Sequence, residues 1–155
     1  MGSSKGFTVV EQGHVVSIIP PASATTALTS DCFLMENWGH ASIILTTGVG
    51  SGCTVTVFDS NSATASGASM AFNYAVEGTA LGDTMDAALA AATTAGTALG
   101  SSGETMIIEI DADELRDGYP YILVRTDNVT AMYIGGVAVL SGGRYQKDIT
   151  ATAIL

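Results

Sequence analysis

The sequence predicts an all-β protein, a β-sandwich or jelly roll of about eight to nine antiparallel strands. Short runs of alternating apolar and polar residues recur at spacings of roughly ten residues, as in such folds. Polar turns and glycines, 18 of them in 155 residues, separate these runs. The regular helices that a parallel βαβ arrangement requires are missing from the pattern. A chain of this length fits one domain that buries roughly 70% of its unfolded surface, so no metal or disulfide is needed for stability.

The first 26 residues are predicted to form an N-terminal arm, and residues 27–155 a single domain. Residues 7–10 and 14–19 are short β-prone pieces. Pro20 and Pro21 then end the second piece, because proline removes a hydrogen-bond donor and restricts the preceding residue. An arm of this kind often reaches over a neighbouring subunit. We therefore expect that deleting residues 1–25 leaves the domain folded.

Four strands are expected between residues 32 and 76. Two of them flank a corner at residues 37–39, and residues 53–59 form the next with alternating valines and threonines. A long polar hairpin loop leads to residues 70–76, which have the most regular two-residue alternation in the chain.

The segment from residue 79 to residue 103 is rich in alanine, threonine and glycine, and it allows two interpretations. Asp83 or Thr84 could cap a short helix over residues 84–92, since alanine has the best helix propensity. A loop or an edge strand fits the same residues. The C-terminal tail, residues 146–155, ends in apolar residues and is expected to be an added edge strand or a second docking arm.

Residues 106–140 hold three strand-like runs joined by two short polar turns, and we interpret them as a three-stranded meander at the centre of the domain. Gly118 ends the first turn and is free to take a positive φ. Leu115 is the large apolar side chain that would pack under that turn. Gly135 and Gly136, in the third run, predict a bulge or a close approach of another backbone.

The charge and composition exclude several classes of partner. The net charge is −10, whereas binding to a nucleic-acid backbone needs clustered lysine and arginine, so nucleic acid is not an expected partner. Only 13% of the residues are charged, and the surface must therefore consist largely of small uncharged side chains. Such a surface suits a protein that is docked against neighbours. No apolar run has the length of a membrane span or a secretion signal, so we expect a soluble protein made in the cytoplasm and no membrane partner.

No residue pattern indicates catalysis, a metal site or a cofactor. His14 and His40 are the two histidines, and each is expected to have a structural role. The Gly-x-Ser-x-Gly pattern of a nucleophile elbow is absent. Cys32 and Cys53 are expected to be free, buried thiols, with a disulfide as the alternative. We therefore expect a protein that is not an enzyme.

Other short patterns have simple structural explanations. Asp111, Asp113 and Asp117 fail the EF-hand pattern, because Leu115 and Arg116 stand where a ligand and a glycine are required. The glycine-rich residues 48–52 lack the lysine and the helix of a phosphate-binding loop, and the sequon at residues 128–130 is too short to be informative. Five aromatic residues could line a carbohydrate-binding face, but their spacing favours separate core and interface positions: Trp38, Tyr119, Tyr121, Tyr133 and Tyr145.

Between residues 33 and 145 the chain resembles the head decoration, or cement, proteins of tailed bacteriophages. The resemblance is carried by NWGHASIIL (37–45), VTVFDS (55–60) with AFNY (71–74), IIEIDADEL (107–115) leading to GYPYILVR (118–125), and VAVLSGGRY (137–145). It implies a β-sandwich that assembles as a homodimer or homotrimer on the capsid exterior of a virion. There it would bridge major capsid protein subunits against the internal pressure of the DNA. The resemblance transfers no functional residues, because the family has no shared active site.

The sequence thus predicts a structural virion protein that stabilises a capsid. The alternative function is that of a carbohydrate-binding jelly-roll module of a virion fibre or a secreted protein. Contacts with the capsid or with other copies are expected from the arm, the tail and two aromatic residues: Phe7, Val9, Val10, Pro20, Pro21, Trp38, Tyr145, Ile154 and Leu155.

Overall fold

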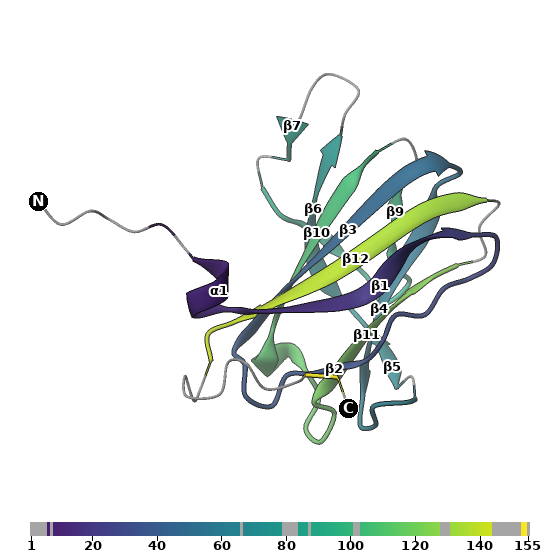
Figure 1. The fold of residues 1–155 in the computed structure, drawn as a ribbon. Coiled ribbons are helices and arrows are strands. Elements are labelled where there is room, and N and C mark those ends of the chain that lie inside the picture. Colours follow the sequence, from purple (N-terminus) through teal and green to yellow (C-terminus); the bar gives the residue numbers. More distant parts are fainter. Residues whose placement is uncertain are drawn as a thin grey trace, which may run out of the picture.

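A computed structural model describes residues 6, 8–65, 67–78, 84–86, 88–100, 103–127, 131–143 and 153–154. One short helix, α1 (Val9–Gln12), and the 3₁₀ turn η1 (Ala112–Glu114) accompany the strands (Figure 1). The strands are β1 (His14–Ala24), β2 (Phe33–Leu34), β3 (His40–Gly50), β4 (Cys53–Ser60), β5 (Ala68–Met70), β6 (Phe72–Gly78), β7 (Thr84–Met85), β8 (Ala90–Ala92), β9 (Thr97–Leu99), β10 (Thr105–Asp111), β11 (Tyr121–Thr126) and β12 (Met132–Ser141).

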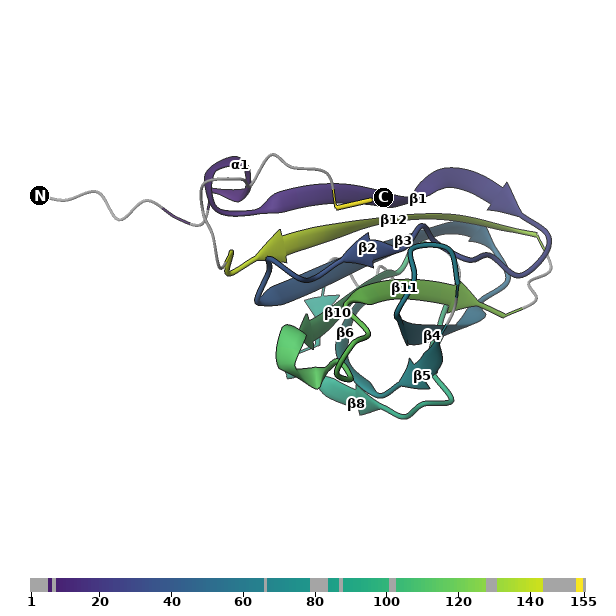
Figure 2. The ribbon, with the colours of Figure 1, turned by 90° about the horizontal axis from the view of Figure 1, so that it is seen from below.

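The described strands form two antiparallel sheets packed as a sandwich. The large sheet has seven strands in the order β1-β12-β3-β10-β6-β7, with β8 beside β6. The small sheet has five strands in the order β2-β11-β4-β5, with β9 beside β4. Figure 2 shows β12 and β3 on one side of the molecule and β11 and β4 on the other. The all-β sandwich predicted from the sequence is confirmed.

The core lies between the two sheets and is filled by every second residue of the long strands. Ile43 of β3, Ile108 of β10 and Ala138 of β12 are fully buried and point inward from the large sheet. Val57 of β4 and Val124 of β11 meet them from the small sheet. The two-residue alternation in the sequence therefore has a direct physical meaning, because it assigns one face of each strand to the core.

The predicted N-terminal arm differs from the structure at residues 14–24, which form the edge strand β1 of the large sheet. β1 pairs with β12, and its Val16, Ile18 and Ile19 are buried in the core. Pro20 and Pro21 do not end the strand. They lie in an irregular stretch between the pairs Ile19–Gly136 and Ala22–Ile134, on an edge strand where proline is tolerated.

The predicted meander over residues 106–140 is wrong. β10 and β12 both belong to the large sheet but are separated by β3, and β11 lies in the small sheet. In a sandwich the chain crosses from one sheet to the other. Consecutive strands then lie in different sheets, where they do not pair.

The crossover from β10 to β11 is held by the features that the sequence placed in this turn. Leu115 packs against the core, and Gly118 has a φ of +81°. Arg116 donates two hydrogen bonds to the buried carboxylate of Asp59, with Nε–Oδ2 and Nη2–Oδ1 distances of 2.7 and 2.6 Å. This pairing lowers the pKa of Asp59 and holds the crossover against the C-terminal end of β4.

Of the two interpretations of residues 84–92, the edge strand is correct and the helix is not, because the described part of this segment contains the strands β7 and β8. Residues Ala90–Ala92 pair with Tyr74, Asn73 and Phe72 of β6. The hydrogen bonds offered by the edge of β6 outweigh the modest helix propensity of three alanines. The one α-helix among the described residues is α1, in a stretch where the sequence favoured a strand.

Cys32 and Cys53 are buried and are not joined by a disulfide, as predicted. Of the C-terminal tail, the described residues Ala153 and Ile154 pack on the sandwich, where the carbonyl of Ala153 accepts a hydrogen bond from the amide of Leu34. Among the described residues, no helix has both the length and the apolar character needed to cross a bilayer.

Candidate functional site

The side of the large sheet that faces away from the core, here called the outer face, carries an unusual distribution of side chains. Antiparallel pairing aligns its outward residues in rows that run across the strands. One row, here called the apolar row, consists of Ser17, Val137, Ile44, Ile107 and Ala75. Apart from the serine at its edge, this row is entirely apolar. Ile44, Ile107 and Val137 are half-buried and Ala75 is buried, although no layer of described residues covers this face.

A groove of about 670 Å³ opens on the outer face where β1, β12 and β3 meet. Ile44 and Val137 of the apolar row contribute to its lining, and Tyr133, which is 59% exposed, adds an aromatic ring. The irregular stretch of β1 forms one side of the groove. There Pro21 lies so close to Gly135 that a side chain at that glycine would contact the proline ring at 3.2 Å. Gly135 and Gly136 thus mark a close approach of strands, which is one of the two readings predicted for them.

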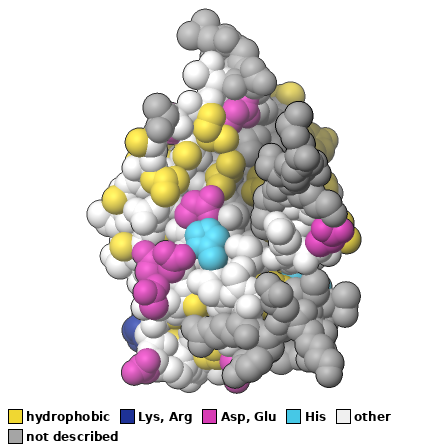
Figure 3. All heavy atoms as spheres, turned by 90° about the vertical axis from the view of Figure 1, so that its left-hand side faces the viewer, with side chains coloured by type: hydrophobic (Ala, Val, Ile, Leu, Met, Phe, Trp, Pro, Cys, Tyr) yellow, Lys and Arg dark blue, Asp and Glu magenta, His cyan; other side chains and the backbone are white. Residues whose placement is uncertain are grey.

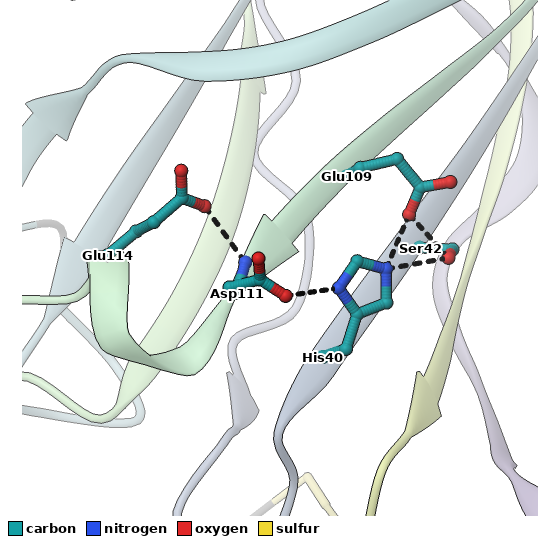
Figure 4. A network of polar contacts seen from close by, with 5 residues as sticks. All are labelled: His40, Ser42, Glu109, Asp111 and Glu114. Atoms are coloured by element: carbon teal, nitrogen blue, oxygen red, sulfur yellow. Dashed lines mark hydrogen bonds and ion pairs between the residues drawn. The ribbon is translucent and has the colours of Figure 1, made fainter. Parts of the chain in front are cut away.

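Next to the apolar row lies a polar group of four residues, here called the His40 cluster: His40, Ser42, Glu109 and Asp111. The first two project from β3 and the other two from the paired positions of β10. His40 Nδ1 lies 2.7 Å from Asp111 Oδ1, and His40 Nε2 lies 2.7 Å from Glu109 Oε2 (Figure 4). The hydroxyl of Ser42 donates to the same Glu109 oxygen at 2.6 Å.

The contacts of the His40 cluster favour a charged imidazole. Partial burial works to lower the pKa of His40, but the hydrogen bonds to Asp111 and Glu109 and the charges of these carboxylates outweigh it and raise the pKa above its ordinary value. Both ring nitrogens then donate to carboxylates. The ring has no lone pair with which to take a proton from Ser42, whose hydroxyl is in any case directed at Glu109. The cluster contains the serine, histidine and aspartate of a catalytic triad. Its imidazole, however, donates to two carboxylates, and this arrangement is an ion-pair clamp between two strands.

A further contact ties this clamp to the crossover turn. The backbone amide of Asp111 donates to Glu114 Oε2 at 2.8 Å, at the start of η1. Asp111, the first residue of the rejected calcium pattern, therefore starts this capped turn and holds a histidine. Among the described residues, no group of three or more metal-ligating side chains is close enough to hold a metal ion.

The sequence assigned His40 a structural role but did not predict its partners. The available signal was the alternation at His40–Ser42 and at Glu109–Asp111, which places each pair on one face of its strand. Only the pairing of β3 with β10 shows that these two faces are the same one.

The structure places the predicted interface residues in different environments. Val10 of α1 is 86% exposed, Val9 is half-buried, and Pro20 and Pro21 are exposed on β1. Trp38 is buried and stacks on His14, with 6.0 Å between the ring centroids. Ile154 is half-buried and packs against the core. Phe7, Tyr145 and Leu155 lie outside the described residues.

The aromatic residues considered for a carbohydrate-binding face do not share one surface. Trp38 is in the core, Tyr119 lies under the guanidinium of Arg116, and Tyr133 is on the outer face. Tyr121 belongs to β11 of the small sheet. Tyr145 lies outside the described residues.

Comparison with known proteins found similarity to a solved structure. No protein-family model and no curated protein matches the chain. Among solved structures, the chain is similar to the SPBc2 prophage-derived protein YomS, with a TM-score of 0.46 and 12% sequence identity over 82% of this chain and 94% of that one. A likeness at this level does not extend to function.

Proposed function

We propose that this chain is a structural protein of a tailed-phage virion that binds the capsid exterior and stabilises it without catalysis. Its partner would be the major capsid protein, and the chain would also associate with itself as a dimer or trimer. The proposal rests on the sequence resemblance described above and on the character of the outer face.

The observation that carries the proposal is an apolar groove and row on a face with no covering layer among the described residues. Valine and isoleucine in the centre of a solvated sheet face are unfavourable unless another surface covers them. Val15 at the margin of this face is 52% exposed and Tyr133 is 59% exposed. Figure 3 shows hydrophobic side chains gathered beside a histidine and its flanking carboxylates. A protein partner would bury these hydrophobic side chains together with the polar residues beside them.

The predicted action is adhesion through several weak contacts. A dimer or trimer that holds two or three capsid subunits at once gains strength from effective concentration, without any single tight contact. Val10 on α1 and Pro20 on β1 are also exposed and do not line the groove, so they are available for contacts outside it.

Co-sedimentation with heads assembled from the major capsid protein of the same genome tests this function. The wild-type chain should sediment with the heads in a fixed ratio, and the heads should survive a higher temperature or a lower salt concentration when it is bound. Ile44→Ser, which makes the centre of the apolar row polar, should reduce occupancy several-fold. Val49→Ser serves as the matched control, since Val49 is 80% exposed near the end of β3 and does not line the groove. Absence of the wild-type chain from the sedimented heads would refute the proposal.

One observation favours a carbohydrate-binding function as the second candidate. The Tyr133 ring lies at the groove beside the hydroxyl-bearing residues Ser17, Ser23 and Thr46, and a ring next to hydrogen-bonding groups is a common way to hold a sugar. A glycan array probed with the wild-type chain and with Tyr133→Ala distinguishes the two functions. Binding to a defined glycan that is lost in the variant would support the second candidate.

A further inference from the structure

The outer face combines its apolar row with negative charge at a defined spacing. On β10, Ile107 belongs to the apolar row, Glu109 lies in the next row and Asp111 in the row after that. Successive outward residues on a strand are roughly 7 Å apart, so the two carboxylates lie about 7 and 14 Å from the apolar row. On the other side of that row, Glu77 lies in the row of Thr46 and Thr105.

The carboxylates of the His40 cluster retain capacity for another cation. Glu109 uses one oxygen, Oε2, for both of its contacts in the cluster, and its other oxygen points away from the imidazole (Figure 4). The side chain of Asp111 is 64% exposed. An ionised carboxylate accepts several hydrogen bonds, so one histidine does not saturate two of them.

A second copy of the chain is poorly suited to cover this face. The chain has 15 acidic and five basic residues, and its net charge is −10. Of the two described arginines, Arg116 is paired with Asp59, and Arg125 belongs to β11 of the small sheet with its guanidinium 5.5 Å above the ring of Phe58. Two copies placed outer face to outer face would bring like charges together, which is unfavourable.

We infer that the outer face binds a basic, apolar segment of the partner protein, in which hydrophobic side chains enter the groove and a lysine or arginine two to four residues away reaches Glu109 and Asp111. An extended segment presents alternate residues on one face at the same roughly 7 Å spacing as the rows of the sheet. The inference rests on the proposed function and names the chemistry of the partner at that site.

Fluorescence anisotropy with three labelled nine-residue peptides tests this chemistry without the natural partner. In each peptide every second residue is a serine. The positions between the serines hold leucines followed by lysines in the first peptide, leucines followed by glutamates in the second, and lysines alone in the third. The first peptide should bind the wild-type chain roughly tenfold more tightly than the second at low salt, as expected for two partly exposed ion pairs. It should also bind more tightly than the third, which lacks hydrophobic side chains.

Variants assign the selectivity to the site. Glu109→Gln with Asp111→Asn should reduce the lysine-over-glutamate preference to less than about threefold, whereas the exposed Glu36→Gln should leave it unchanged. Ile44→Ser should weaken the first two peptides alike. Adding 0.5 M salt to the wild-type chain should abolish the preference as well, and this measurement does not depend on the folding of any variant.

Three outcomes of the measurements in solution would overturn the inference. They are equal binding of the lysine and glutamate peptides by the wild-type chain, a preference that persists in the double variant, and a dimer in solution that dissociates in Ile44→Ser, which would assign the face to a second copy. Capsid binding that is unchanged in the double variant would also refute the inference while leaving the proposed function intact. Lysine-selective peptide binding without capsid binding would refute the proposed function and leave the site chemistry standing.

Discussion

Removal of β1 provides the strongest test of the fold, because the sequence alone suggested that these residues form a dispensable arm. Deleting residues 1–25 removes Val16, Ile18 and Ile19, which are 5%, 1% and 5% exposed. Burying each such side chain contributes about 1.5 to 3 kcal/mol, so the deletion removes roughly 5 to 9 kcal/mol. That loss is comparable with the whole stability of a typical domain, and we expect the truncated chain not to fold.

Point variants on the same strand keep this prediction testable if the truncated chain aggregates. Ile18→Ala should lower the free energy of unfolding by about 2 to 5 kcal/mol, because it leaves a cavity in the core. Val15→Ala should change it by less than about 0.5 kcal/mol, since Val15 is 52% exposed on the outer face. Urea unfolding followed by the fluorescence of Trp38, the single tryptophan, measures both.

Two results would refute this reasoning. One is a truncated chain that unfolds at the wild-type urea concentration, which would mean that β1 contributes nothing to the core. The other is a pair of point variants with equal losses, which would mean that the inward and outward positions of β1 are assigned incorrectly.

Three further predictions concern single positions. The raised pKa of His40 adds stability that is complete below the unfolded histidine value of about 6.5 and is lost as pH rises through the folded value; the excess stability of the wild-type chain over His40→Gln in urea unfolding should therefore be larger at pH 5.5 than at pH 9. A pH-independent difference would contradict the clamp. Gly136→Ala should cost about 1 to 3 kcal/mol in the same assay, because its new methyl group would lie 2.6 Å from the Leu45 side chain, and a neutral effect would show that the core yields there. Burial and the nearby Asp127 raise the pKa of Cys53 to about 11, and burial with Asp31 raises that of Cys32, so neither thiol should react with a maleimide at pH 7 until urea unfolds the chain; rapid labelling of the native chain would refute their burial.

The short-range pattern of the sequence predicted most of the strands. The predicted strand at residues 53–59 corresponds to β4, and the corner at residues 37–39 lies between β2 and β3. The sequence left alternatives open, or gave a wrong prediction, where propensity had to compete with pairing. Ala90–Ala92 form a strand because β6 offers an edge, and Pro20 and Pro21 lie within a strand because β1 needs hydrogen bonds on one side only.

The candidate site was less accessible to sequence reasoning than the fold. Ile44 and Ile107 were each assigned to a strand, but nothing local showed that they lie side by side with Val137. The same is true of His40 and Asp111, which are 71 residues apart in sequence and joined by a 2.7 Å contact.

The sequence by itself determined the class of fold, the alternation of inward and outward residues and the acidic, weakly charged surface, because each depends on composition or on neighbours along one strand. Only the tertiary structure decided the order of the strands, the place of residues 14–24 in the large sheet and the meeting of the apolar row with the His40 cluster. Strand pairing joins residues that are distant in the chain. A two-residue alternation shows which face of its strand a side chain occupies, but it does not show which strand lies beside it.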